Sequence, residues 1–270
     1  MEHDHAAILA RFDTQIRQGT APDGSGSRAE RPGPVVRWTA DGERGWSGIS
    51  WSDLDRETAD EVIAAQVSFF RARGEGFEWK LYDYDQPADL GERLRAAGFV
   101  PEDAESLMVA ETAQLTGPVP AAAGGPGPAA IRLVPVTDEV GVGRLIDVHD
   151  RVFGTDHTRL RNSLIAQLNF APESTATAMV VAMAGDEPVS SARIDFYAGT
   201  EFAGLWGGGT LPPWRGRGIY RALVAYRARL AAARGYRYLQ VDASPESRPI
   251  LERLGFARLA VTTPHTWSAG

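Results

Sequence analysis

Cysteine is absent from this 270-residue sequence, which excludes disulfide bonds, thiolate metal ligands and a cysteine nucleophile. No stretch approaches the roughly 18 consecutive apolar residues that a membrane-spanning helix requires. The N-terminus, MEHDHAAILARF, has no cationic start followed by an apolar run, so it does not read as a secretory signal. No Gly-x-Ser-x-Gly motif of a serine hydrolase occurs, and the histidines show no metal-ligand spacing. We therefore expect a soluble, cytoplasmic protein with no metal site and no membrane partner.

The composition is that of a globular protein, with 43% hydrophobic and 23% charged residues. The net charge of −7 argues against nucleic acid as a partner, because such affinity comes mostly from cationic side chains on phosphates. Residues 211–260 nevertheless hold ten arginines against three acidic residues. A local positive field of this kind suits a small polyanionic ligand.

The length favours two domains, and the segment 116–130, TGPVPAAAGGPGPAA, is typical of a linker between them. We therefore expect one domain at 1–115 and another at 131–270. In the second, periodicity and turn residues predict alternating strands and helices, hence an α/β or α+β fold with a mixed sheet flanked by helices. The strands are expected at 131–134, 178–184, 189–197, 201–207, 238–241 and 257–263, and the helices at 138–152, 160–168, 219–234 and 247–254.

The first half repeats the later part of this order of elements. Strands are expected at 47–51, 79–84 and 106–112, and helices at 56–73 and 90–97. The segment GERLRAAGF at 91–99 stands where PILERLGF stands at 249–256. The shared order favours a duplication over coincidence.

The most informative segment lies between a predicted strand and a predicted helix. It reads Arg215-Gly216-Arg217-Gly218-Ile219-Tyr220-Arg221. The first amides of a helix have no intrahelical partners and lie at the positive end of its dipole. Glycines remove the Cβ atoms that would keep an anion from these amides, and the arginines add charged donors. The pattern indicates a diphosphate site, although a solvated basic turn would share it.

Two other nucleotide motifs do not fit: no Gly-Lys-Ser/Thr follows, and no acidic residue sits at the place at the end of a next strand that a dinucleotide fold requires. The segment instead resembles the signature of the GNAT superfamily of N-acetyltransferases. The resemblance rests on the Arg-x-x-Gly-x-Gly/Ala-like run at 215–220, the Val-x-Pro-like turn at 210–212 and the Leu-Gly-Phe ending at 254–256. It implies a tandem protein: a mostly antiparallel GNAT sheet in the second domain, preceded by a smaller, degenerate GNAT-like domain.

The resemblance also implies a cofactor, acetyl-coenzyme A, and the residues that hold it. The backbone of 215–221 would bind the diphosphate. Gly209, Thr210 and Leu211 would pair with the pantetheine arm, and one amide there would stabilise the oxyanion of the thioester. Ser244 is expected either to touch the same arm or to serve as a strand-end residue. The run of three glycines at 207–209 is compatible with close approach of another chain or with a flexible turn.

Two positions depart from the family pattern. Tyr220 stands where Gly or Ala is usual, which would tighten the diphosphate pocket if the ring leans toward it. Leu251 stands where many members carry a tyrosine acid, and leucine cannot protonate a leaving thiolate. As general base the first candidate is Glu201 and the second is Asp195, each with the alternative of being a solvated carboxylate.

The first half lacks the diphosphate motif. At the matching position the chain reads SDLDRETADE at 52–61, which is half acidic and would repel an anion. The aromatic and acidic segment at 79–85 would line a cationic acceptor pocket or form a half-buried strand.

These features predict an enzyme that transfers an acetyl or other acyl group from acetyl-coenzyme A to an amine of a small molecule or peptide. A non-catalytic acyl-coenzyme-A-binding module is the main alternative, and a transferase using aminoacyl-tRNA is a third. The acceptor and the oligomeric state, with a homodimer as one option, stay open.

Overall fold

The computed structural model describes residues 4–19, 27–41, 45–117, 131–170 and 176–269. Contacts divide the chain into two compact units that are interleaved in sequence. The first unit comprises Met1–Met108, Asp242–Glu252 and Ala257–Gly270, and the second comprises Val109–Val241 and Arg253–Phe256. Most of the predicted linker, 118–130, lies outside the described residues.

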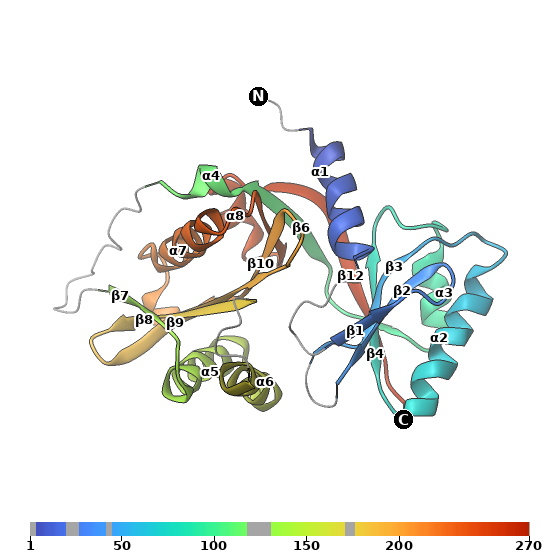
Figure 1. Cartoon of the computed structure of the whole chain (residues 1–270), viewed down its shortest axis with the longest axis horizontal. Coiled ribbons are helices and arrows are strands. Elements are labelled where there is room, and N and C mark those ends of the chain that lie inside the picture. Colours follow the sequence, from blue (N-terminus) through green and yellow to red (C-terminus); the bar gives the residue numbers. More distant parts are fainter. Residues whose placement is uncertain (1–3, 20–26, 42–44, 118–130, 171–175, 270) are drawn as a thin grey trace. The chain divides into compact units, whose positions relative to one another are not determined.

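The first unit contains a sheet with the strand order β1-β2-β3-β4-β12 and helices packed on it (Figure 1). The pair β3/β4 is parallel, whereas β1/β2, β2/β3 and β4/β12 are antiparallel. The strands are β1 (Ser27–Glu30), β2 (Val35–Ala40), β3 (Gly48–Ser52), β4 (Phe77–Tyr82), β5 (Val100–Pro101), the start of β6 (Glu105–Glu111) and β12 (Ala257–Trp267). The helical elements are α1 (His5–Phe12), a π-helical turn (Asp13–Arg17), α2 (Ala59–Arg73), α3 (Leu90–Ala96) and most of α8 (Arg248–Arg253).

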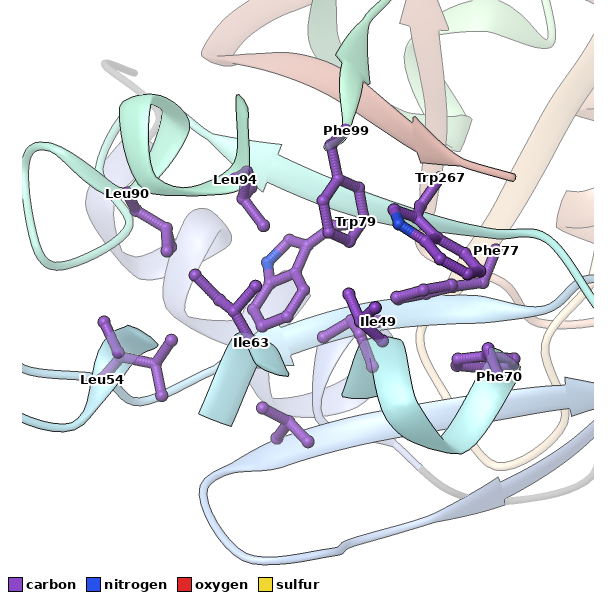
Figure 2. Close-up of a cluster of buried hydrophobic side chains, with 13 residues drawn as sticks. Ile49, Leu54, Ile63, Phe70, Phe77, Trp79, Leu90, Leu94, Phe99 and Trp267 are labelled. Carbon is purple, nitrogen blue, oxygen red and sulfur yellow. The ribbon is translucent and has the colours of Figure 1, made fainter. Parts of the chain in front are cut away.

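Aromatic side chains dominate the core of the first unit. Trp79 of β4 is 1% exposed, and Phe99 meets its ring edge-on at 6.4 Å. Phe77 stacks on Phe70 of α2 with ring centres 4.1 Å apart, and Trp267 of β12 lies beside it. Figure 2 shows these rings with the aliphatic residues of α2, α3 and β3 around them. The C-terminal strand is therefore part of this core.

The second unit contains strands in the order β11-β10-β9-β8-β7, and of these pairs only β10/β11 is parallel. Helices α5 and α6 pack on one face of these strands and α7 on the other (Figure 1). The elements are the end of β6, α4 (Thr112–Leu115), β7 (Ile131–Pro135), α5 (Glu139–Phe153), α6 (Thr158–Phe170), β8 (Thr177–Ala184), β9 (Glu187–Phe196), β10 (Phe202–Thr210), a 3-10 turn (Pro212–Trp214), α7 (Ile219–Ala233) and most of β11 (Tyr238–Ala243), whose last two residues belong to the first unit.

Local sequence signals explain where helix α5 begins and ends. Asp138 caps the start of α5, where its Oδ1 accepts a hydrogen bond from the Gly141 N–H at 2.7 Å. The helix ends at Gly154, whose φ of 71° is the left-handed conformation that glycine adopts readily. Leu145 and Ile146 of α5 then pack with Leu164 of α6.

The predicted fold class is confirmed: the sheet is mixed, mostly antiparallel and flanked by helices. The two Gly-Phe endings are also alike in structure, since Gly98 and Gly255 have φ values of 94° and 97° and are followed by buried phenylalanines. The two compact units do not correspond to the residues before and after the predicted linker at 116–130. Strand β12 pairs with β4, from Thr262 opposite Tyr82 to Trp267 opposite Phe77, so the end of the chain completes the first unit.

Candidate functional site

Strands β10 and β11 are paired only near their beginnings. They run parallel, and the pairing ends at Gly204 and Gln240. Both strands continue, β10 to Thr210 and β11 to Ala243. The backbone groups on the facing edges of these continuations are not paired with each other, so an extended ligand can form sheet-like hydrogen bonds with them.

The backbone of Thr210 is turned toward this opening. The Leu211 N–H donates to the Val189 carbonyl of β9 at 3.0 Å, and the Leu211 carbonyl accepts from the Trp214 N–H at 2.9 Å. Alternate residues of an antiparallel strand turn their backbone groups to the same neighbour, so Thr210 turns its N–H away from β9. Of the three residues predicted to hold the pantetheine arm, Leu211 is thus engaged on both sides and Thr210 faces the opening.

The turn after β10 leads into the start of α7. Gly216 and Gly218 have φ values of 74° and 77°, which residues with a Cβ rarely adopt. Gly218 is the N-cap of α7; among the described residues no side chain caps this end, and the first turn of the helix has no acidic residue. The first amides and the positive end of the helix dipole are therefore available to an anion.

Three arginines surround this turn. The Arg215 Nε donates to the Thr210 carbonyl at 3.0 Å, which fixes the exposed side chain beside the end of β10. The Arg217 guanidinium lies over the Trp214 ring, 4.6 Å from its centre, and Arg221 is exposed on the first turn of α7. All three cations stand at the end of the opening where a diphosphate is expected.

Tyr220 packs against the strand. A Cβ on Gly208 would lie 3.0 Å from a ring carbon of Tyr220 and 3.5 Å from Nη2 of Arg227. The ring thus lies against the β10 backbone on the α7 side, and burial raises the pKa of its hydroxyl. The large Tyr220 side chain, which stands where the family signature has Gly or Ala, is accommodated because Gly208 opposite it has no side chain.

The three glycines of β10 are sites of close approach. One extra residue lies on β10 between Trp206 and Gly209 relative to β9, and Gly207 has a φ of 56°, so the run forms a β-bulge. A Cβ on Gly207 would lie 2.2 Å from Nε2 of His149, and a Cβ on Gly209 would lie 2.8 Å from Val152. Helix α5 therefore packs directly on the bulged backbone.

His149 donates a hydrogen bond to the bulge. Its Nε2 lies 3.1 Å from the Gly207 carbonyl, which can only accept, so Nε2 carries the proton. Burial, with the neighbouring His157, lowers the pKa of His149 to about 4, so the ring is neutral at physiological pH. Its Nδ1 is buried and has no hydrogen-bond partner among the described residues.

A polar cluster lies at the last paired position of β10 and β11. The Tyr197 hydroxyl accepts hydrogen bonds from Trp206 Nε1 at 3.2 Å and from Gln240 Nε2 at 3.3 Å. A Cβ on Gly204 would lie 2.3 Å from this hydroxyl, so glycine is required there. The Oε1 of Gln240 is buried, and none of the described residues donates to it.

The two carboxylates predicted as general bases lie in different places. Asp195 of β9 is opposite Gly204, so its side chain shares a face with the polar cluster. It accepts from Thr177 Oγ1 at 2.9 Å and pairs with Arg193 at 3.3 Å. Glu201 precedes β10, eight residues before Gly209, and its carboxylate lies 3.8 Å from Arg237. Asp195 is the candidate nearer to the opening.

Two further predicted positions belong to the first unit. Ser244 follows β11, and its carbonyl accepts from the amides of Ser247 and Arg248, so it shapes the turn that begins α8. Leu251 is fully buried, so this position contributes apolar packing and no acidic hydroxyl.

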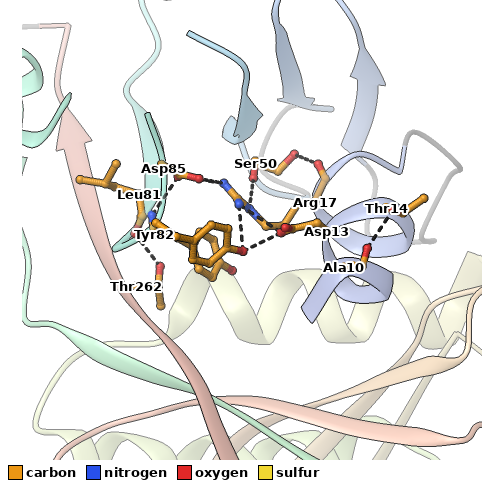
Figure 3. Close-up of polar contacts among 10 residues, drawn as sticks. Ala10, Asp13, Thr14, Arg17, Ser50, Leu81, Tyr82, Asp85 and Thr262 are labelled. Atoms are coloured by element: carbon orange, nitrogen blue, oxygen red, sulfur yellow. Dashed lines mark hydrogen bonds and ion pairs between the residues drawn. The ribbon is translucent and has the colours of Figure 1, made fainter. Parts of the chain in front are cut away.

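The acidic and aromatic segment of the first half surrounds a cation of the protein itself. Arg17 is 2% exposed, donates to both Asp85 oxygens at 2.8 Å and lies over the Tyr82 ring at 4.1 Å (Figure 3). It also donates to Tyr84 Oη at 3.0 Å and to Asp13 at 3.1 Å. The acidic and aromatic side chains of this segment therefore contact Arg17, a cation of the protein itself.

A second buried charge cluster lies in the first unit. Lys80 of β4 forms an ion pair with Asp242 of β11, whose side chain is 4% exposed. Although burial alone would lower it, the pKa of Lys80 is raised by this carboxylate. Burial and Asp242 raise the pKa of Glu105 on β6 to about 7.

Sequence reasoning did not single out Gly204, Trp206, Gln240 or Arg227. The three polar groups around Gly204 come from Tyr197, directly after β9, from Trp206 of β10 and from Gln240 of β11, and only the register of these strands brings them together. Arg227 lies on the buried side of α7, where helical periodicity favours an apolar residue.

Within the part of the chain that the structure describes, no group of three or more His, Asp or Glu residues could hold a metal ion. None of the described helices is long and apolar enough to cross a lipid bilayer.

Comparison with known proteins agrees with this geometry. Residues 144–256 match the model of the acetyltransferase (GNAT) family. A GCN5-related N-acetyltransferase from Kribbella flavida has 19% sequence identity to this chain, with coverage of 100% of this chain and 97% of that one and a TM-score of 0.67. A tandem GNAT protein from the clavulanic acid biosynthesis pathway has 14% identity, coverage of 99% and 96%, and a TM-score of 0.62.

A GCN5-related N-acetyltransferase from Sphaerobacter thermophilus has 16% identity, coverage of 87% and 81%, and a TM-score of 0.56. No curated protein is significantly similar in sequence to this chain. At these identities the solved structures establish the fold alone. Together with the family match, they show that the chain has a GNAT fold and carries an acetyltransferase (GNAT) family domain at residues 144–256.

Proposed function

We propose that the chain transfers an acetyl or other acyl group from acyl-coenzyme A to an amine. The observation that carries the proposal is the separation of β10 from β11 after Gly204 and Gln240, directly before the glycine turn at the start of α7. This arrangement offers an edge for an extended thioester arm and a cationic helix start for a diphosphate at its end. The family match supports acyl transfer in general.

The cofactor would lie along β10. The amides of Gly216 to Arg221 would hold the diphosphate, with Arg215 and Arg217 beside it. The Thr210 N–H, which faces the opening, would pair with the pantetheine arm or with the thioester carbonyl. A backbone amide fixed in this way stabilises an oxyanion without having to reorganise during the reaction.

The acceptor would approach on the α5 side of β10, near Asp195 and the Gln240 Oε1, to which none of the described residues donates. The amine nitrogen attacks the thioester carbon, and the carbonyl electron pair moves to the oxygen. Collapse of this intermediate breaks the carbon–sulfur bond, and coenzyme A leaves as a thiolate that solvent then protonates. The proton released by the amine passes to Asp195, directly or through water.

A non-catalytic acyl-coenzyme-A-binding module is the second candidate. The observation that favours it is the fully buried Leu251. The family resemblance implies a tyrosine acid at this position, and leucine cannot protonate a thiolate. A chain of this kind would bind acyl-coenzyme A and release no thiol.

The test is thiol release from acetyl-coenzyme A in the presence of small-molecule and peptide amines. Asp195→Asn is expected to lower kcat by about 100-fold, the usual contribution of a general base, while the Kd for acetyl-coenzyme A stays unchanged. Asp186→Asn, in the exposed β8–β9 turn, is the matched control and should behave as wild type. Binding of acetyl-coenzyme A without thiol release from any amine would refute the enzyme and leave the binding module.

A further inference from the structure

Helix α7 buries a full positive charge beneath the glycine run of β10. Arg227 is 1% exposed, and its Nε donates to the Leu223 carbonyl at 3.1 Å. Its Nη1 donates to the Arg193 carbonyl of β9 at 3.0 Å. Both partners are neutral carbonyls, and no carboxylate of the described residues forms an ion pair with this guanidinium.

Such a charge is expensive to keep inside a protein. Buried arginines are almost always paired, because removal from water disfavours the charged form. Here burial lowers the pKa of Arg227 to about 10. Among the described residues the group that opposes this shift is the Tyr220 hydroxyl, and burial raises its pKa, so it is uncharged at neutral pH. The presence of such a destabilising charge would be explained if Arg227 interacts with a negative charge on a bound ligand.

The guanidinium lies against the backbone of β10 at Gly208, within the part of the strand that borders the opening. A Cβ on Gly208 would lie only 3.5 Å from Nη2, so the missing side chain lets the charge approach the β10 backbone. Gly208 lies between Leu205 and Thr210, the stretch of β10 that is no longer paired with β11. Low-dielectric packing by α7 leaves the field of this charge poorly screened.

We propose that Arg227 stabilises, across the β10 backbone at Gly208, the thiolate that leaves when the thioester bond breaks. The inference rests on the proposed function. In the step concerned the carbon–sulfur bonding pair moves to sulfur, and the resulting negative charge is held by the guanidinium until solvent protonates it. The fixed charge of Arg227 thereby does the work of a proton donor, a role that leucine at position 251 cannot perform.

The test is the pKa of the coenzyme A thiol in its complex with the protein, followed by ultraviolet absorbance of the thiolate. In Arg227→Met this pKa is expected to rise by about one or more, as for two charges one side-chain layer apart at an effective dielectric constant near 20. Arg227→Lys should restore part of the effect. Arg229→Met, an exposed position of the same helix, is the matched control and should change nothing.

Stability gives an independent reading. Removing an uncompensated buried charge should leave the melting temperature of Arg227→Met unchanged or raise it, while kcat for acetyl transfer falls at least 10-fold. A lower melting temperature with an unchanged thiol pKa would show a merely structural arginine and overturn the inference. Failure of the folded wild type to bind coenzyme A would refute the proposed function as well, whereas binding with equal thiol pKa values would refute only the role of Arg227.

Discussion

Replacing Arg17 with methionine should lower the free energy of unfolding of the first unit by about 3–5 kcal/mol at pH 7. The change removes the charge that faces Asp85, whose side chain is only 4% exposed. Burial raises the pKa of Asp85 even with Arg17 present, so the carboxylate would be left charged and uncompensated. The cation contact with the Tyr82 ring at 4.1 Å is lost at the same time.

The loss should depend on pH in a defined direction. Without Arg17 the pKa of Asp85 rises further, so protonation removes the penalty as pH falls. The difference in unfolding free energy between wild type and Arg17→Met should therefore be smaller at pH 5 than at pH 7. An effect that grows toward pH 5 would contradict this assignment of charge.

Urea unfolding followed by tryptophan fluorescence is the assay, because five of the seven tryptophans report on the first unit. These are Trp38, Trp46, Trp51, Trp79 and Trp267. The matched control is Arg73→Met, which breaks the exposed ion pair with Glu75 and should change stability by less than about 1 kcal/mol. A loss below about 1 kcal/mol for Arg17→Met would refute a structural role for the buried network.

Two further predictions concern buried ionisable groups. Lys80→Met should destabilise the first unit by about 3–5 kcal/mol, because Asp242 then stays buried without its partner. The double variant Lys80→Met/Asp242→Leu should recover most of this loss in urea unfolding. Losses that simply add up in the double variant would contradict the prediction. The pKa of His149 is lower in the folded protein than its ordinary value, so the unfolded chain takes up this proton at a higher pH than the folded chain does. The stability it contributes is complete above about pH 6.5 and falls as the pH approaches 4, by at most about 3 kcal/mol. His149→Phe should lack this part of the pH dependence of the melting temperature, and an identical profile would contradict the assignment.

The sequence was sufficient wherever the physics is local. The turn from Arg215 to Gly218 could be predicted because the strand end, the glycines and the helix start are consecutive in the chain. The residue types that cap a helix or close a hairpin likewise lie within a few positions of each other. This is why the order of strands and helices, and hence the fold class, followed from periodicity and turn chemistry.

The partners of these elements could not be predicted in the same way. Strand β12 was expected, but nothing in its own residues says that it pairs with β4, which lies about 180 residues earlier. The acidic and aromatic residues around Tyr82 were noticed as a cation site, but the cation, Arg17, comes from a distant helical turn. Which glycine of β10 meets His149 depends on a bulge that only the pairing with β9 reveals.

The central claim is that the cofactor binds at the turn that begins α7, and calorimetric titration with acetyl-coenzyme A tests it directly. Gly218 and Gly199 have φ values of 77° and 76°, and neither has an atom within 4 Å of an added Cβ. Substitution by alanine should therefore destabilise the fold about equally at both positions, by roughly 1–2 kcal/mol.

Wild type and Gly199→Ala should bind acetyl-coenzyme A with similar affinity, because Gly199 lies in the distant β9–β10 turn. Gly218→Ala should bind at least about 10-fold more weakly, since its Cβ stands at the amides that hold the diphosphate. Failure of the folded wild type to bind, or equal affinities for all three proteins, would contradict the account.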